Sequence, residues 1–208
     1  MENSTHTAHA KNQRTVSSYE GCARAYADEV GPDPSEISKQ ALQRLVRLLE
    51  PGARVLEIGS GPGWDADYVE TLGITIRRTD ATQAFCDFQA ERGKHVDLID
   101  VIADDLGGPY QGAVALYVLQ HIDRTLIASV LQKIAAAIQP LGLFLLTIKE
   151  GSGEYVEQGT EAGEYQVVRW LLDDFVAQLN AAGLTVEWHA RKVYPDGTWL
   201  TLLARKKV

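Results

Sequence analysis

The segment from Glu57 to Gly63, with glycine at positions 59, 61 and 63, is the feature that most constrains the fold of this chain. It follows the apolar run Arg54–Ile58 and precedes a helical pattern that begins at Trp64. An apolar run that leads directly into glycines is typical of a buried parallel strand. Glycines let the backbone turn sharply and approach a ligand without a Cβ in the way. In open α/β sheets such loops lie beyond the carboxyl ends of strands, where ligands bind.

The rest of the chain alternates between strand and helix patterns, which predicts a doubly wound α/β sheet. Helices are expected over 17–29, 35–49, 64–72, 82–92, 124–138 and 167–182. Strands are expected over 54–58, 74–79, 95–101, 112–118, 143–148, 184–193 and 198–205. The acidic, glycine-rich stretch 151–163 is predicted to be a loop. The last two strands are joined by a tight turn, so they predict an antiparallel hairpin at one edge of the sheet.

Length and composition favour one globular domain. The 208 residues, 45% of them hydrophobic, are enough to bury a sizeable core. Residues 1–16 are polar and lack the apolar centre of a secretory signal, so they are predicted to be a disordered tail. Residues 17–208 are predicted to form the single domain, with helices over 17–50 covering its ligand site.

Charge and cysteine usage disfavour several classes of protein. The formal net charge of −8 gives no electrostatic support for nucleic-acid binding, and the basic runs Arg77-Arg78 and 205–207 are interpreted as solvated charges. No apolar run reaches the length of a membrane span. Cys22 and Cys86 are isolated and fit a reducing compartment, so a cytoplasmic protein without a metal site is expected. Nothing in the sequence indicates an oligomeric state.

Two acidic residues beyond the glycine loop sharpen the prediction of a ligand site. Asp80 ends the second expected strand, at the distance where a carboxylate can accept hydrogen bonds from ribose hydroxyls. Asp100 lies near the end of the third expected strand, where it can accept from an adenine amino group. Asp104 is the alternative, and Asp100 is preferred because it lies closer to the expected strand end.

Two common nucleotide motifs fit this loop poorly. The dinucleotide fingerprint G-x-G-x-x-G needs a sixth-position glycine, and this chain has Trp64 there. An indole at that position would obstruct the close packing of helix on strand. A phosphate-binding P-loop needs Gly-Lys-Ser/Thr, which is absent. The pattern is instead G-x-G-x-G, with an acid, Glu57, two residues before the first glycine.

The segment from Val55 to Gly63 resembles the first motif of class I S-adenosylmethionine-dependent methyltransferases. The resemblance covers about residues 17–205 and includes Asp80, Asp100 and the final hairpin. It implies a Rossmann-like, doubly wound, seven-stranded sheet with helices on both faces and the last strand antiparallel. It also implies an enzyme that passes a methyl group from S-adenosylmethionine to an acceptor by direct displacement, leaving S-adenosylhomocysteine. Because no appended recognition domain is recognisable, the expected acceptor is a small molecule.

The resemblance also assigns cofactor contacts. The implied residues are Glu57, Gly59, Ser60, Gly61, Gly63, Asp80, Ala81, Asp100, Val101 and Tyr117. The loop would line the methionine and ribose parts, with Glu57 near the methionine ammonium. Asp80 would hold the ribose hydroxyls, while Ala81, Asp100 and the backbone of Val101 would surround the adenine. The end of the fourth strand would offer main-chain contacts to the methionine end.

Several residues outside these motifs are candidates for roles near the methyl group. Tyr26 is predicted to cap the cofactor, because an aromatic face favours a sulfonium cation; packing of the first helix is the alternative. His121 follows the fourth strand and is the candidate general base or acceptor-orienting residue, with a structural hydrogen bond as the alternative. Trp64 and the region from Lys149 to Gly163 are candidates for walls of the acceptor pocket, or for ordinary packing and a solvated loop.

Two other functions stay open on the sequence. A non-catalytic module that binds S-adenosylmethionine and regulates a partner would share the cofactor motifs but have a blocked acceptor pocket. A nicotinamide-dependent oxidoreductase would need the dinucleotide fingerprint, against which Trp64 argues.

Overall fold

A mostly parallel sheet forms the centre of the protein in the computed structural model, which describes residues 2–159 and 163–208. The strands are β1 (Arg54–Ile58), β2 (Thr75–Asp80), β3 (Val96–Leu98), β4 (Tyr110–Ala115), β5 (Ile138–Glu150), β6 (Glu154–Gln158), β7 (Glu164–Trp170), β8 (Leu184–Tyr194) and β9 (Gly197–Lys206). The helices are α1 (Glu2–Val30), α2 (Glu36–Arg47), α3 (Trp64–Thr71), α4 (Gln83–Ala90), the short 3-10 helix η1 (Leu119–His121), α5 (Ile127–Ala137) and α6 (Leu172–Ala181).

The order of the strands confirms the predicted doubly wound α/β fold. Strands β3, β2, β1, β4 and β5 lie side by side and parallel, and β9 pairs antiparallel with both β5 and β8. Ile58 lies opposite Thr79, and Asp80 lies opposite Leu98. The carboxyl ends of β1, β2 and β3 therefore meet at one edge, and the loops that follow them lie together.

Helices cover both faces of the sheet, because successive side chains of a strand point to opposite faces. Val55 of β1 packs in one apolar cluster with Leu42 of α2 and Val69 of α3. The next residue, Leu56, belongs to the other cluster, which includes Leu131 of α5 and residues of α6. Burial on both faces explains why β1 reads as a nearly continuous apolar run.

The described residues form nine strands, whereas the resemblance implies seven. The additional pair, β6 and β7, is an antiparallel hairpin, and β7 joins the end of β5 at Lys149 and Glu150. The sequence predicts a loop over 151–163 and one helix over 167–182, and both expectations are corrected here, since α6 begins only at Leu172. Val168 and Trp170 are buried on this hairpin, and β-branched and aromatic residues fit such a half-buried pleated surface.

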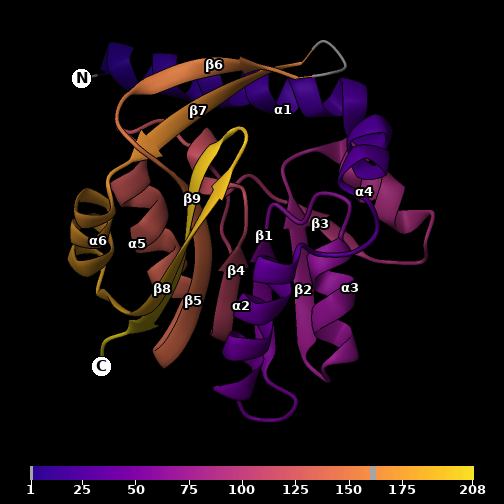
Figure 1. The fold of residues 1–208 in the computed structure, drawn as a ribbon, viewed down its shortest axis with the longest axis vertical. Coiled ribbons are helices and arrows are strands. Elements are labelled where there is room, and N and C mark those ends of the chain that lie inside the picture. The colour runs from indigo at the N-terminus through magenta and orange to yellow at the C-terminus, as the bar shows by residue number, and fades with distance from the viewer. Residues whose placement is uncertain (1, 160–162) are drawn as a thin grey trace.

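Helix α1 begins at Glu2, well before the first helix predicted at residue 17, and takes in residues predicted to belong to a disordered tail. Ala8 is buried in the core, and Thr15 Oγ1 accepts a hydrogen bond from the backbone amide of Gln166 at 3.0 Å. Tertiary contacts of this kind stabilise a helix whose own sequence is polar. Figure 1 shows α1 lying across one end of the sheet with the β6–β7 hairpin beside it.

Contacts at two places fasten α1 to the rest of the protein. The Ser18 hydroxyl donates to the Glu164 carbonyl at 2.9 Å and accepts from the Glu164 amide at 3.0 Å. The Glu20 carboxylate accepts from the Gln83 and Ala84 amides at 2.7 and 2.9 Å, which caps the start of α4. Although α1 is long, no helix in the described ranges is both long and apolar enough to cross a membrane.

Candidate active site

The glycine loop lines a cavity of about 500 Å³ that lies between the carboxyl edge of the sheet and α1. A volume of this size is within the ~300–1,000 Å³ typical of small-ligand sites. Most of the sequence-predicted site residues line it, namely Tyr26, Gly59, Ser60, Gly61, Asp80, Ala81, Asp100, Val101, Tyr117 and His121. Glu57 and Gly63 are close in sequence to these residues, but they do not line the cavity.

Two glycines of the loop occupy positions that no other residue would tolerate. Gly59 has φ of +65° and Gly63 has φ of +86°, in the left-handed region that favours glycine. A Cβ on Gly59 would collide with the Val118 side chain, and a Cβ on Gly63 would collide with Gln89 and lie 2.8 Å from Arg78. The glycines therefore serve both the turn itself and the close approach of neighbouring side chains.

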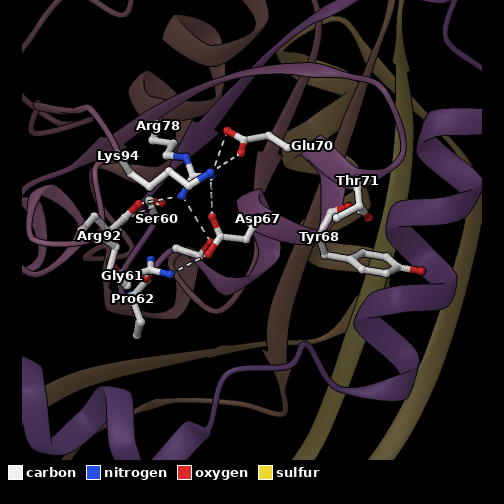
Figure 2. A network of polar contacts seen from close by, with 12 residues as sticks. Ser60, Gly61, Pro62, Asp67, Tyr68, Glu70, Thr71, Arg78, Arg92 and Lys94 are labelled. Carbon is white, nitrogen blue, oxygen red and sulfur yellow. Dashed lines mark hydrogen bonds and ion pairs between the residues drawn. The ribbon is translucent and has the colours of Figure 1, made fainter.

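A network of polar side chains holds the loop from the side away from the cavity (Figure 2). Three consecutive loop carbonyls, at positions 61, 62 and 63, accept hydrogen bonds from Gln89, Arg92 and Arg78 at 2.8, 2.5 and 3.4 Å. Gln89 also donates to Ser60 Oγ at 2.9 Å. The loop thus has its shape before any ligand arrives, and preorganisation of this kind lowers the entropic cost of binding.

Arg78 is the centre of this network, which corrects the interpretation of Arg77-Arg78 as solvated charges. Its side chain is 2% exposed and pairs with Asp67 at 2.7 Å and with Glu70 at 2.8 Å. Arg92 pairs with the same Asp67 at 2.6 Å (Figure 2). A buried charge of this kind needs such partners, because an unpaired charge in the interior is strongly destabilising.

Three carboxyl groups lie around the glycine loop in surroundings that disfavour their charge. Glu57 Oε2 is buried without a hydrogen-bond partner, and burial raises the pKa of Glu57 to about 8. Asp65, in the first turn of α3, lines the cavity, and burial raises its pKa to about 6. Asp80 accepts from the Gly61 amide at 2.7 Å and the Thr82 amide at 2.8 Å, yet burial still raises its pKa. A positively charged ligand would stabilise the ionised carboxylates, and an anionic ligand would oppose them.

The part of the cavity beyond Asp80 is apolar and carries one carboxylate. Phe85 and Val101 contribute buried apolar walls, and the half-buried Asp100 lines the cavity beside Val101. Asp104 does not line the cavity, because its carboxylate accepts from the Asp100 amide at 2.8 Å and supports the turn. The structure therefore brings Asp100, and not the alternative Asp104, to the cavity.

Tyr117 marks the end of β4 and has an unusual backbone conformation. Its φ is +59°, and such strain in a non-glycine residue persists only where the surroundings enforce it, commonly at functional sites. Its amide donates to Thr147 Oγ1 at 2.6 Å, and its carbonyl accepts from Gln120 at 2.6 Å. The ring packs edge-on against Trp199, with centroids 5.0 Å apart.

A second cavity of about 380 Å³ adjoins the first. The residues that line both are Tyr19, Tyr26, Tyr117, His121, Asp196 and Trp199. The second cavity is built by α1, the β6–β7 hairpin, the end of β5 and the turn between β8 and β9, and the predicted pocket residue Lys149 lies in its wall. Trp64 lines the first cavity and packs against the Arg92 guanidinium at 4.1 Å, so it is both a wall and a packing residue.

His121 lies at the junction of the two cavities. Its Nδ1 is 2.8 Å from the Gln166 carbonyl, which can only accept, so Nδ1 carries the hydrogen and Nε2 carries a lone pair. Nε2 accepts from the side-chain amide of Gln120 at 3.0 Å and from the Tyr19 hydroxyl at 3.3 Å. Burial lowers the pKa of His121 to about 4. At neutral pH the ring is therefore uncharged and can accept a proton.

Three site residues were not singled out from the sequence. Asp65 could have been found, because it is an acid in the first turn of the helix that follows the glycine loop. Gln120 and Trp199 carry no local signal, since only the folded chain brings η1 and β9 to the same cavity.

Comparison with protein families gives one match over most of the chain. A family model described as a methyltransferase domain matches residues 34–189. A search of the curated proteins finds no match.

Solved structures share the fold at low sequence identity. A 1,6-didemethyltoxoflavin-N1-methyltransferase from Burkholderia thailandensis, with bound 1,6-didemethyltoxoflavin and S-adenosylhomocysteine, is 23% identical, with a TM-score of 0.72 over 96% of this chain and 89% of that one. An S-adenosylmethionine-dependent methyltransferase from Methanosarcina mazei is 12% identical, with a TM-score of 0.71 over 85% and 99%. Magnesium protoporphyrin IX methyltransferase from Synechocystis PCC 6803, with bound S-adenosylmethionine, is 14% identical, with a TM-score of 0.64 over 82% and 81%.

Proposed function

The chain belongs to the methyltransferase domain family, and we propose that it is an S-adenosylmethionine-dependent enzyme that methylates a small molecule. The similar enzyme from Burkholderia thailandensis holds a small heterocycle together with S-adenosylhomocysteine, which supports an acceptor of that size. Cys22 and Cys86 are both free, which supports a reducing compartment such as the cytoplasm.

The observation that carries the proposal is the group of acidic residues at the glycine loop. S-adenosylmethionine has a positively charged sulfonium and an ammonium group, and Glu57, Asp65 and Asp80 surround the loop with carboxyls whose ionised forms a cation stabilises. A nicotinamide dinucleotide would instead bring its anionic pyrophosphate to this loop. The charge of the site therefore favours the sulfonium cofactor over the dinucleotide.

The residues that line the first cavity fit the parts of this cofactor. Asp80 accepts two backbone hydrogen bonds and one from the Thr82 hydroxyl, and its remaining lone pair would accept from a ribose hydroxyl. Asp100 and Val101 would face the adenine, and Asp65 would face the methionine ammonium. Glu57 acts from behind the loop, where its carboxyl hydrogen-bonds Ser60. Tyr26 would present its ring to the sulfonium.

The protein's part in the reaction is to position the acceptor and to take up a proton. When bound, S-adenosylmethionine would supply an electrophilic methyl group, whose carbon an acceptor atom attacks as the sulfur leaves. The second cavity would hold the acceptor beside the first, and positioning of this kind is the main source of rate enhancement in such a displacement. His121 Nε2 accepts the proton that an acceptor O–H or N–H loses, and the Gln166 carbonyl keeps the required tautomer.

A non-catalytic binding module is the second candidate. Such a module would have a blocked acceptor pocket, and the second cavity beside the cofactor cavity argues against it. A cavity of this size and position supports an enzyme.

Calorimetric titration with S-adenosylmethionine, S-adenosylhomocysteine and NAD tests the proposal. We expect micromolar binding of both adenosyl ligands and none of NAD. Asp80→Ala should weaken adenosyl binding about 30-fold, because it removes hydrogen bonds to a charged group. Asp87→Ala is the matched control, since Asp87 is exposed on α4 and should leave binding unchanged. Failure of both adenosyl ligands to bind, or tighter binding of NAD, would overturn the proposal.

A further inference from the structure

Aromatic rings enclose the second cavity from several directions. Tyr19 of α1 and Tyr165 of β7 lie with ring centroids 4.6 Å apart and planes inclined by 35°. Tyr117 and Trp199 form a second aromatic pair that also lines this cavity. Flat apolar walls of this kind favour a planar ligand, which can stack on one ring and meet the edge of another.

The charges in this cavity are unsuited to an anion. Among the described residues that line it, Lys149 is the one lysine or arginine, and its side chain is 3% exposed. Asp196 at 3.0 Å and Glu157 at 3.6 Å already pair with its ammonium. Two carboxylates therefore face one ammonium there. The local charge is net negative and favours a neutral or positively charged ligand.

Gln120 contributes a buried acceptor without a donor. Its NH₂ group donates to the Tyr117 carbonyl at 2.6 Å and to His121 Nε2 at 3.0 Å, and both partners can only accept, so the orientation of the amide is fixed. The residue is 4% exposed, lines the second cavity, and its Oε1 has no hydrogen-bond partner. A buried amide oxygen left without a donor costs about 1–3 kcal/mol. The oxygen is enclosed in the free protein, and because the residue lines a cavity, a small shift of the amide toward a ligand would supply the missing donor.

From the walls, the charge and the unpartnered oxygen, we infer that the methyl acceptor is a planar nitrogen heteroaromatic, neutral or cationic, with an N–H that donates to Gln120 Oε1. This inference rests on the proposed function, because it names the substrate class of the same site. It excludes acceptors that bind through a carboxylate or phosphate, saturated acceptors without a flat face, and heterocycles with every nitrogen alkylated.

A matched pair of pteridines tests this inference in the protein saturated with S-adenosylhomocysteine. Lumazine is planar and carries ring N–H groups, and 1,3-dimethyllumazine has the same ring without them. Calorimetric titration at pH 7 should give at least tenfold tighter binding of lumazine, since a site built around a hydrogen bond rejects the analogue that lacks it. The planar anion 2-naphthoate should bind more weakly than lumazine.

Gln120→Leu should remove the discrimination, so that lumazine binds about tenfold more weakly and no better than 1,3-dimethyllumazine. Gln132→Leu makes the same chemical change at an exposed position of α5 and should bind like the unmodified protein. Binding of S-adenosylhomocysteine should be unchanged in Gln132→Leu. The same titration of Gln120→Leu checks that the cofactor cavity is intact after the Tyr117 carbonyl has lost its donor.

The outcomes separate the inference from the proposed function. If the unmodified protein does not bind S-adenosylhomocysteine, the proposed function and the inference are overturned together. Binding of S-adenosylhomocysteine with equal affinity for the two pteridines, with no binding of lumazine, or with tighter binding of 2-naphthoate would overturn the inference alone. The comparison of the two pteridines uses the unmodified protein, so it decides the question even if Gln120→Leu does not fold.

Discussion

Around the glycine loop, three consecutive carbonyls and both oxygens of Asp80 have hydrogen-bond partners within the protein, whereas in the second cavity the amide oxygen of Gln120 has none. The glycine loop that lines the first cavity is held by segments that lie close together in the chain, namely β1, β2, α3 and α4. The second is assembled from α1, the β6–β7 hairpin, β5, η1 and the β8–β9 turn. A cofactor common to a family can be recognised by one compact stretch of chain, while the acceptor is recognised by segments that only the complete fold brings together.

The largest effect is expected from breaking the network behind the loop. Arg78→Met would leave Gln89 Oε1, which is buried, without its donor. Asp67 and Glu70 keep Arg92 and Lys94 as partners, so we expect a loss of about 1–3 kcal/mol in the free energy of unfolding. In a protein of this length that lowers the melting temperature by about 2–12 °C, measurable by circular dichroism.

Arg205→Met provides the matched control for the network. Arg205 pairs with Glu187 near the surface, at 2.6 Å, and exposed pairs contribute about 1 kcal/mol or less. If Arg78→Met and Arg205→Met lowered the free energy of unfolding equally, the network behind the loop would contribute no more to stability than an exposed ion pair does.

The second effect concerns the acceptor side and should appear in activity with little change in stability. His121→Asn keeps a side-chain N–H near the Gln166 carbonyl but removes the lone pair that takes the proton. We expect kcat to fall about 100-fold, with KM and the melting temperature nearly unchanged. Unchanged kcat would mean that His121 has only a structural role.

The pH dependence of His121 sharpens this prediction. Its folded pKa of about 4 lies below the ordinary 6.5, so the neutral, proton-accepting form persists as the pH falls from 8 to 5 and is lost near pH 4. Nuclear magnetic resonance of the ring C–H signals should give a midpoint near 4 in the ligand-free protein. A midpoint near 6.5 would contradict the enclosed position of the ring.

The smallest effect tests an exception on the cofactor side, the buried carboxyl of Glu57, whose Oε2 has no hydrogen-bond partner. The pKa of Glu57 is about 8 in the folded protein against an ordinary 4.5, so between these values the native state binds more protons and stability falls as the pH rises. Glu57→Gln removes this effect and should raise the stability at pH 8, relative to pH 5, by on the order of 1–2 kcal/mol. Thermal melts at the two pH values measure it.

Glu50→Gln makes the same substitution at an exposed position and should show no such pH dependence. If Glu57→Gln were no more stabilising at pH 8 than at pH 5, Oε2 of Glu57 would already have a donor in the free protein. Weaker binding of S-adenosylmethionine by Glu57→Gln would accompany the gain in stability, since the carboxyl then serves the ligand at the expense of the fold.

The sequence was sufficient for the parts of the molecule that are local in the chain. The glycine loop, Asp80 and the alternation of strands and helices follow from short segments, and the predicted doubly wound α/β sheet with an antiparallel last strand was confirmed. The sequence could not show that Arg78, and not Arg77, is the buried arginine. Which of two adjacent side chains is buried depends on which face of β2 meets Asp67 and Glu70. The early start of α1 was missed for the same reason, since its buried residues contact β7, which lies far along the chain.

Helix α1 lines both cavities. Glu20 fastens it to α4 and Ser18 fastens it to β7, while Tyr19 and Tyr26 on the same helix line both cavities. A ligand in one cavity that shifts these two rings changes the free energy of filling the other. Thermodynamic linkage then requires reciprocity: whatever factor the adenosyl ligand adds to acceptor affinity, the acceptor adds to adenosyl affinity. A fragment limited to the matched residues 34–189 would lack α1 and with it this cooperativity.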